Sequence, residues 1–195
     1  MTITEQKAAQ RKAGIAARRA LSDTERTRSN AALCARIMAL DCFKKAENIL
    51  LYAAFGGEAD LSTLAVEAAR QGKTLAYPVC GEGFSLTAAV PGPDGWEVGA
   101  YGIRTPALER AALIRPEALD LVLVPCTAFD AACRRVGMGK GYYDRYLPRC
   151  RNAVTLGVAF EAQRVPEAAA DEQDRRLDGF VTERKVYRGT DKFEL

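Results

Sequence analysis

The pattern of apolar and polar positions predicts alternating helices and buried strands along this chain of 195 residues. Continuous apolar runs, typical of strands that are covered on both faces, occupy residues 48–54, 73–79, 121–125 and 153–159. A helix is predicted between the first two runs, from about residue 60 to 72. This strand–helix–strand order implies a parallel sheet with a right-handed crossover. Residues 179–182 are predicted to form a last short strand.

Two helices are predicted before the first strand. Residues 4–21 are rich in alanine and cations, which favours a helix that Gly14 weakens slightly. Ser22 and Glu25 have the spacing of a capping box, so a second helix is predicted from there to about residue 40. We interpret residues 1–40 as a helical pair packed on a single α/β domain that spans residues 1–195. Lys7 and Arg11 share one face of the first helix, which from the residues alone is either solvated or part of a site.

Helical and buried-strand signals stop between residues 80 and 106. An apolar run at 84–90 and a segment rich in proline and glycine at 91–95 predict a hairpin-like excursion. We expect it to lie near the mouth of the candidate ligand site described below. The single tryptophan, Trp96, lies just beyond these turns. It is either a packing residue of this excursion or a substrate contact.

Composition and charge narrow the class of protein. With 48 % hydrophobic residues, the chain can bury one sizeable core, and its formal charge of +3 is far below that of a dedicated nucleic-acid binder. No apolar run approaches the ~20 residues that span a membrane, and the N-terminus lacks the apolar core of a signal peptide. We therefore expect a cytoplasmic protein with neither membrane nor nucleic-acid partners.

The chain has six cysteines and no histidine. Without histidine, a Ser-His-Asp arrangement is excluded, and chemistry near neutral pH must depend on carboxylates, lysine, backbone donors or a cofactor. No C-x-x-C pair suggests a zinc site, so the cysteines are interpreted as thiols in a reducing compartment. Cys126 and Cys133 lie between the 121–125 run and the glycines at 137, 139 and 141, which leaves a redox or nucleophilic role as an alternative.

The segment after the 121–125 run concentrates the candidate chemistry. Glycines at 137, 139 and 141 allow the backbone to turn tightly and to point successive N–H groups at phosphate oxygens. Lys140 adds a mobile charge, and Arg135 can add a bidentate contact. Asp144 lies at the start of a predicted short helix, which begins near residue 142 and ends at Pro148, and can bind Mg²⁺ through one carboxylate.

This loop matches neither of the two common nucleotide motifs. It is not a Walker A loop, because Gly and Tyr follow Lys140. It is not a dinucleotide fingerprint, because about ten residues separate the strand from the first glycine. From the residues alone the loop is either a phosphate site or an ordinary glycine turn.

The run from Val124 to Leu147 resembles the signature of 5-formyltetrahydrofolate cyclo-ligases, also called 5,10-methenyltetrahydrofolate synthetases. Shorter matches follow the order of that family along nearly the whole chain: Lys7 and Arg11, Tyr52 to Glu58, Gly72 to Pro78, Gly102 to Pro106, Gly157 to Gln163, and Asp174 and Asp178.

The resemblance implies a ligase of one-carbon metabolism that cyclises 5-formyltetrahydrofolate to 5,10-methenyltetrahydrofolate, consumes ATP with Mg²⁺, and releases ADP and phosphate. It also implies a monomer with a three-layer αβα fold. The sheet of that fold is mostly parallel, akin to the sugar-phosphate isomerase and CoA-transferase-like group.

Site residues are carried over by matching position. The resemblance assigns ATP to Lys7, Arg11, Arg135, Val136, Gly137, Met138, Gly139, Lys140, Gly141, Tyr142 and Tyr143. Catalysis is assigned to Arg135 and Lys140. Substrate contacts are assigned to Ala53, Glu58, Trp96 and Tyr142, and the metal to Asp144 and Asp174.

Phe84 and Leu86 stand where the family frequently has a methionine and a phenylalanine. Two further departures from the family pattern are Thr105 and Gln173, where the family often has glutamate and histidine. They favour an alternative, a non-catalytic protein of the same fold that binds reduced folates or nucleotides. A third possibility is an RNA-associated protein that uses the basic first helix, although that helix lacks the interleaved aromatic residues that stack on bases.

Overall fold

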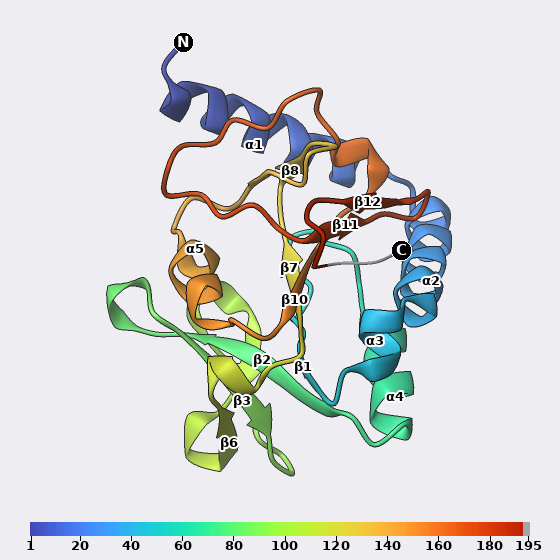
Figure 1. Cartoon of the computed structure of the whole chain (residues 1–195), viewed down its shortest axis with the longest axis vertical. Coiled ribbons are helices and arrows are strands. Elements are labelled where there is room, and N and C mark those ends of the chain that lie inside the picture. The colour runs from blue at the N-terminus through green and yellow to red at the C-terminus, as the bar shows by residue number, and fades with distance from the viewer. Residues whose placement is uncertain (193–195) are drawn as a thin grey trace.

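An eight-stranded sheet forms the centre of the computed structural model, which describes residues 1–192 (Figure 1). Its strand order is β12-β11-β10-β7-β1-β2-β3-β6. The strands from β11 to β2 run parallel, whereas β12, β3 and β6 pair antiparallel with their inner neighbours. The prediction of a mostly parallel sheet is confirmed. The last three residues of the predicted domain, 193–195, lie outside the described part of the chain.

The strands of the large sheet are β1 (Asn48–Leu50), β2 (Thr74–Cys80), β3 (Leu86–Pro91), β6 (Ala111–Ile114), β7 (Leu121–Pro125), β10 (Val154–Val158), β11 (Gly179–Val181) and β12 (Val186–Arg188). Two small antiparallel pairs stand beside it: β4 (Trp96–Val98) with β5 (Arg104–Pro106), and β8 (Ala128–Phe129) with β9 (Arg135–Val136). The helices are α1 (Ile3–Arg19), α2 (Asp23–Ala39), α3 (Asp41–Lys45), α4 (Ser62–Arg70) and α5 (Tyr142–Tyr146).

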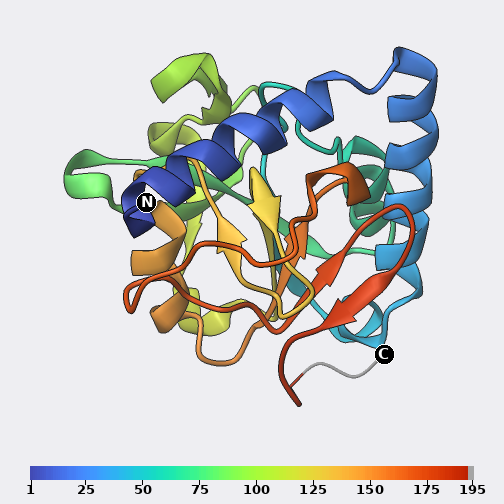
Figure 2. The ribbon, with the colours of Figure 1, turned by 90° about the horizontal axis from the view of Figure 1, so that it is seen from above.

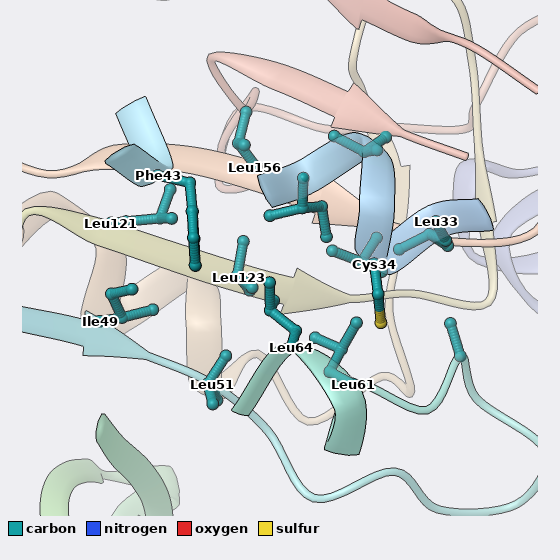
Figure 3. Close-up of a cluster of buried hydrophobic side chains, with 14 of the residues drawn as sticks. Leu33, Cys34, Phe43, Ile49, Leu51, Leu61, Leu64, Leu121, Leu123 and Leu156 are labelled. Atoms are coloured by element: carbon teal, nitrogen blue, oxygen red, sulfur yellow. The ribbon is translucent and has the colours of Figure 1, made fainter. Parts of the chain in front are cut away.

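Helices cover both faces of the sheet, which confirms the three-layer architecture. Strand β7 shows why: Leu121 and Leu123 pack with α2, α3 and α4 on one face, and Val122 and Val124 pack toward α5 on the other. All four side chains are fully buried. The core between the sheet and helices α2, α3 and α4 is filled by leucines from the sheet and the helices together with Phe43 (Figure 3). Among residues 1–192, no helix is both long and apolar enough to cross a membrane.

The predicted helical pair forms with few changes. Ser22 caps α2 as expected: its hydroxyl accepts from the N–H of Glu25, whose carboxylate accepts from the Ser22 N–H at 2.9 Å. Helix α2 packs against α4, whereas α1 contacts β8, β9 and the turn Glu161–Gln163. Seen from above, α1 lies across the ends of the central strands (Figure 2).

Several strand boundaries differ from the prediction. Strand β1 ends at Leu50 rather than at residue 54, because the chain then turns into a loop that the Tyr52 hydroxyl closes by donating to the Ala59 carbonyl at 2.8 Å. Strand β3 begins at Leu86, after a turn that contains Phe84 in the left-handed region (φ 58°). Strands β6 and β12 were not predicted, since each has only three or four residues and lies at an edge of the sheet.

Gly14 lets α1 approach the sheet closely. A Cβ at this position would lie 1.9 Å from the carbonyl oxygen of Thr127, in the connection that follows β7. The glycine that weakens the isolated helix is therefore required for its docking.

We expect Gly14→Ala to lower the free energy of unfolding by about 1–3 kcal/mol, as in other overpacked sites, because backbone rather than a flexible side chain blocks the new methyl group. Unfolding in urea measures the change. Ala13→Gly, on the exposed face of the same helix, is the control, and should cost about 1 kcal/mol through helix propensity alone. A Gly14→Ala protein as stable as the wild type would contradict this close contact.

Candidate active site

A cleft of about 1150 Å³ opens at the carboxyl ends of β1, β2 and β7. This is the edge at which open α/β sheets bind ligands. Its walls come from α1, the loop after β1, the end of β2, the β4–β5 hairpin, the segment from β9 into α5, and residues 171–174. The cleft is larger than the site of a single small ligand, so two ligands can lie in it side by side.

The glycine loop between β9 and α5 is held by its carbonyl groups. Arg11 Nε donates to the Gly137 carbonyl at 2.8 Å, and Arg145 Nη1 donates to the carbonyls of Lys140 and Gly141 at 2.8 and 3.0 Å. Gly139 and Gly141 adopt left-handed φ values of 93° and 69°, which glycine tolerates without strain. The N–H groups of residues 138–141 find no acceptor within residues 1–192. They are therefore available to an anion.

Lys140 extends from this loop over the ring of Phe84, with 5.7 Å between its Nζ and the ring centroid. The Arg145 guanidinium lies 5.4 Å from the same centroid, and the Tyr142 ring meets it edge-on. A cation–π contact is weak at an exposed site, so Lys140 can leave the ring for a phosphate.

Arg135 has a buried guanidinium that donates hydrogen bonds to other residues of the protein. Its side chain is only 4 % exposed; Nη2 donates to Asp144 Oδ1 at 2.7 Å and Nη1 donates to the Arg175 carbonyl at 2.6 Å. The same Asp144 oxygen accepts from the Arg175 N–H. A buried guanidinium needs such acceptors. The predicted phosphate residue and the predicted metal residue are thus brought together, as an ion pair at the cleft wall.

Lys7 pairs with the second predicted metal residue. Its ammonium lies 2.5 Å from both Asp174 and Asp171. Although burial opposes it, hydrogen bonds to the two carboxylates raise the pKa of Lys7, and Lys7 in turn lowers the pKa of Asp171. Asp171 was missed by the sequence analysis, since an acidic surface segment contains many such residues. Within residues 1–192, no group of three metal-ligating side chains is found.

Glu58 stands on the other side of the cleft, in the loop after β1. Its side chain is 12 % exposed, and Oε2 accepts from the Phe55 N–H at 3.1 Å. Burial raises the pKa of Glu58, and the hydrogen bond from the Phe55 N–H and the charge of the nearby Arg18 oppose that shift. Ala53, from the same loop, lines the cleft as well.

Trp96 does not line this cleft, whose walls all fall within the described residues. Its ring packs edge-on against Tyr77, with 4.7 Å between the centroids, and carries the Arg104 guanidinium on its face. The packing interpretation of Trp96 therefore fits its surroundings.

The aromatic side chain that the hairpin does present to the cleft is Tyr101. It is 57 % exposed, with a left-handed φ of 62°, in a turn between Gly99 and Gly102. An aromatic residue between two glycines in a loop was the signal that could have pointed to it.

Tyr142 and Tyr143 line the cleft from α5. The Tyr143 hydroxyl is buried and has no hydrogen-bond partner within residues 1–192. Burial raises the pKa of Tyr143 well above its usual value, so its hydroxyl is a neutral donor. An unpaired buried donor beside Glu58 is suited to a polar ligand group.

Comparison with known proteins identifies the family. The sequence model of the 5-formyltetrahydrofolate cyclo-ligase family matches residues 3–183. The chain belongs to this family. The resemblance seen in the sequence is thereby confirmed.

Individual cyclo-ligases agree with this assignment. The mouse enzyme is 27 % identical over 183 residues, which cover 85 % of this chain and 87 % of that enzyme. The Escherichia coli K12 enzyme is 28 % identical over 175 residues, 87 % of this chain and 96 % of that one. The solved structure of the Aquifex aeolicus 5,10-methenyltetrahydrofolate synthetase is similar with a TM-score of 0.84 and 35 % identity. That match covers 97 % of this chain and 95 % of the other.

The six cysteines of this cyclo-ligase family member are all unpaired. Burial raises the pKa of Cys126 to about 12 and that of Cys133 to about 11. Neither Cys126 nor Cys133 is a nucleophile at neutral pH, because so little thiolate is present. Cys80, in contrast, is exposed at the end of β2 and lines the cleft.

We expect iodoacetamide at pH 8 to label Cys80 faster than Cys126 or Cys150 by on the order of 10²-fold or more, because the buried thiols lack both access and thiolate. Peptide mass spectrometry of a labelling time course measures the rates. Cys80→Ser should abolish the fast phase. Rapid labelling of Cys126 in the folded protein would restore the redox interpretation.

Proposed function

We propose that this protein catalyses the ATP-dependent cyclisation of 5-formyltetrahydrofolate to 5,10-methenyltetrahydrofolate, with release of ADP and phosphate. The observation that carries the proposal is one cleft with two unlike sides. A glycine loop with free N–H groups and cations forms one side, and the half-buried carboxylate of Glu58 forms the other. Membership of the cyclo-ligase family and relatives bearing that name support the same reaction.

The reaction suits a site without histidine. The formyl oxygen of the substrate attacks the γ-phosphorus of ATP, and the bond to ADP breaks. N10 of the folate then attacks the activated formyl carbon, loses its proton, and displaces phosphate together with the formyl oxygen. Such a phosphoryl transfer depends on positioning and on neutralising charge, which lysine, arginine and backbone N–H groups provide.

We assign the triphosphate to the glycine loop and to α1. The free N–H groups of residues 138–141 would receive phosphate oxygens, and Lys140 would leave the Phe84 ring to neutralise the transferring phosphoryl group. Arg11 already holds the loop at Gly137 and has further N–H donors for ATP. Lys7 lines the same side of the cleft. Arg135 would act mainly by holding Asp144.

The acidic residues on this side fit a magnesium ion held chiefly by the nucleotide. Asp144 and Asp174 offer hard oxygen ligands, and Asp144 Oδ2 accepts no hydrogen bond from residues 1–192. With one or two carboxylates, Mg²⁺ takes its remaining ligands from phosphates and water. When bound, the ion would neutralise negative charge on the phosphates.

We assign the folate to the side of Glu58. A carboxylate of low exposure can accept both N–H groups on one edge of a pteridine ring. Ala53 and Tyr142 would flank the ring, and Tyr101 would stack on it in place of Trp96, to which the resemblance assigns a substrate contact. The unpaired Tyr143 hydroxyl would donate to the substrate rather than to ATP.

We further infer that the protein is a cytoplasmic monomer and that residues 1–195 form one domain. Six unpaired thiols fit a reducing compartment. A single sheet includes strands from residues 48–188, which supports one domain. The net charge of +3 supports a small-molecule substrate without a nucleic-acid partner.

Purified protein mixed with 5-formyltetrahydrofolate and MgATP should show rising absorbance of methenyltetrahydrofolate, and Lys140→Ala should lower kcat by on the order of 10²-fold or more. Lys12→Ala, an exposed lysine of α1 outside the cleft, is the matched control and should leave the rate unchanged. A flat trace with an active control enzyme would refute the proposed function. If calorimetry then showed both ligands binding without ADP release, the protein would be a non-catalytic binder.

Tyr101→Ala should raise the KM for 5-formyltetrahydrofolate about 10-fold with little change in the KM for ATP, since a stacking surface is lost on the folate side alone. Tyr101→Phe should behave like the wild type. Trp96→Phe, which keeps the packing on Tyr77, should leave both KM values unchanged. The opposite pattern, a change at Trp96 and none at Tyr101, would restore the original assignment.

A further inference from the structure

Arg18 is a buried charge in a helix that is otherwise largely exposed. Its side chain is 2 % exposed, although α1 lies on the surface of the protein. Nε donates to the Gly56 carbonyl at 3.0 Å, and Nη1 donates to the Cys126 carbonyl at 3.4 Å. Nη1 also lies 3.7 Å from Glu58 Oε1. The guanidinium thus joins the loop after β1 to the loop after β7.

Burying a guanidinium is costly unless its charge and its N–H groups are matched. The backbone carbonyls satisfy two donors, but only Glu58 supplies the opposite charge. Arg18 appears in none of the sequence motifs that mark the site. The close docking of α1 through Gly14, one helical turn away, is what brings it under the loop that carries Glu58.

Glu58 is surrounded by groups that stay neutral near pH 7. Tyr52 faces it from the end of β1, Cys126 from the end of β7 and Tyr143 from α5, and burial raises the pKa of all three. Arg18, from α1, is the one charged group that acts on Glu58 within residues 1–192. Burial alone would favour the protonated carboxyl, which accepts fewer hydrogen bonds.

We propose that Arg18 is a positioning residue of the folate side, which keeps the Glu58 carboxylate charged and fixes the loop that carries it. This inference rests on the proposed function, because it assigns Arg18 a role in binding the substrate that Glu58 receives. Arg18 touches neither ligand. It acts through Glu58 and through the carbonyls of Gly56 and Cys126.

The same helix would then serve both substrates. Arg11 lies seven residues before Arg18, roughly 10 Å along the helix at 1.5 Å per residue. Its guanidinium holds the phosphate loop, whereas that of Arg18 holds the carboxylate of the folate side. One rigid element therefore sets the spacing between the two halves of the cleft.

Three variants separate charge, geometry and general stability, and a fourth, Glu58→Gln, tests whether Glu58 itself produces the pH dependence. Arg18→Gln removes the charge but keeps a hydrogen-bond donor, and Arg18→Lys keeps the charge but loses the forked guanidinium. Arg19→Gln, on the exposed side of the same helix, is the matched control. For each protein, urea unfolding, the KM for ATP, and kcat/KM for 5-formyltetrahydrofolate between pH 5 and 9 are measured.

Folate binding requires ionised Glu58, so kcat/KM falls as the pH drops through the pKa of Glu58. Without the Arg18 charge that pKa rises, and in Arg18→Gln the acid limb should move to higher pH by about one pH unit or more. Arg18→Lys should keep the limb near its wild-type position while the KM for the folate rises about 10-fold. Glu58→Gln should lose the limb, and Arg19→Gln should match the wild type in every measurement.

An acid limb in Arg18→Gln at the wild-type position would overturn the proposal, as would equal increases in the KM values for ATP and folate. If Arg18→Gln does not fold, Arg18→Lys decides: an unchanged KM for the folate then refutes a positioning role. Wild-type protein without turnover of 5-formyltetrahydrofolate would instead refute the proposed function. The two failures are therefore distinguishable.

Discussion

The contact between α1 and the strand ends is the constraint on which the rest of the site depends. Gly14 lets the helix axis come so close to the Thr127 carbonyl that no side chain fits between them. From that position Lys7, Arg11 and Arg18 reach three different loops: the acidic segment near residue 171, the glycine loop, and the loop after β1. Helix α1, which packs on the ends of the strands, thus defines one wall of the cleft.

Two cations of the cleft are held by carboxylates of the protein itself. Lys7 pairs with Asp171 and Asp174, and Arg135 pairs with Asp144. These pairs keep mobile charges in place without ligand, which lowers the entropy lost when a substrate orders them. They also mean that any cation at Asp174 would compete with Lys7 for that carboxylate.

Much of the fold could be predicted from the sequence, because its local signals agree with its tertiary structure. Apolar runs predict the parallel core strands, capping residues predict α2, and Pro148 predicts the end of the short α5. Strands β6 and β12 were missed because edge strands of three or four residues have no internal periodicity, and β1 was predicted too long because buried apolar loop residues resemble a strand.

The site could be predicted only where motifs mark it. The glycine loop and Glu58 follow strands that are recognisable in sequence, so their meeting at one sheet edge was foreseeable. Tyr101 and Asp171 line the cleft, and Arg18 contacts Glu58 behind it, through tertiary packing that no spacing along the chain records. Trp96 shows the converse case, a rare residue near the site whose ring does not line the cleft and packs against Tyr77 of β2 and Arg104 of β5.

Two aromatic residues, one beside the cleft and one in its wall, have strained backbone conformations. Phe84 and Tyr101 occupy left-handed backbone conformations, with φ values of 58° and 62°, that cost a residue with a side chain on the order of 1 kcal/mol and that glycine adopts freely. Glycine at either turn would relax the backbone but would remove an aromatic ring from beside Lys140 or from the cleft wall. The molecule thus retains backbone strain at Phe84 and at Tyr101. Selection for the free energy of unfolding alone would favour glycine at both positions.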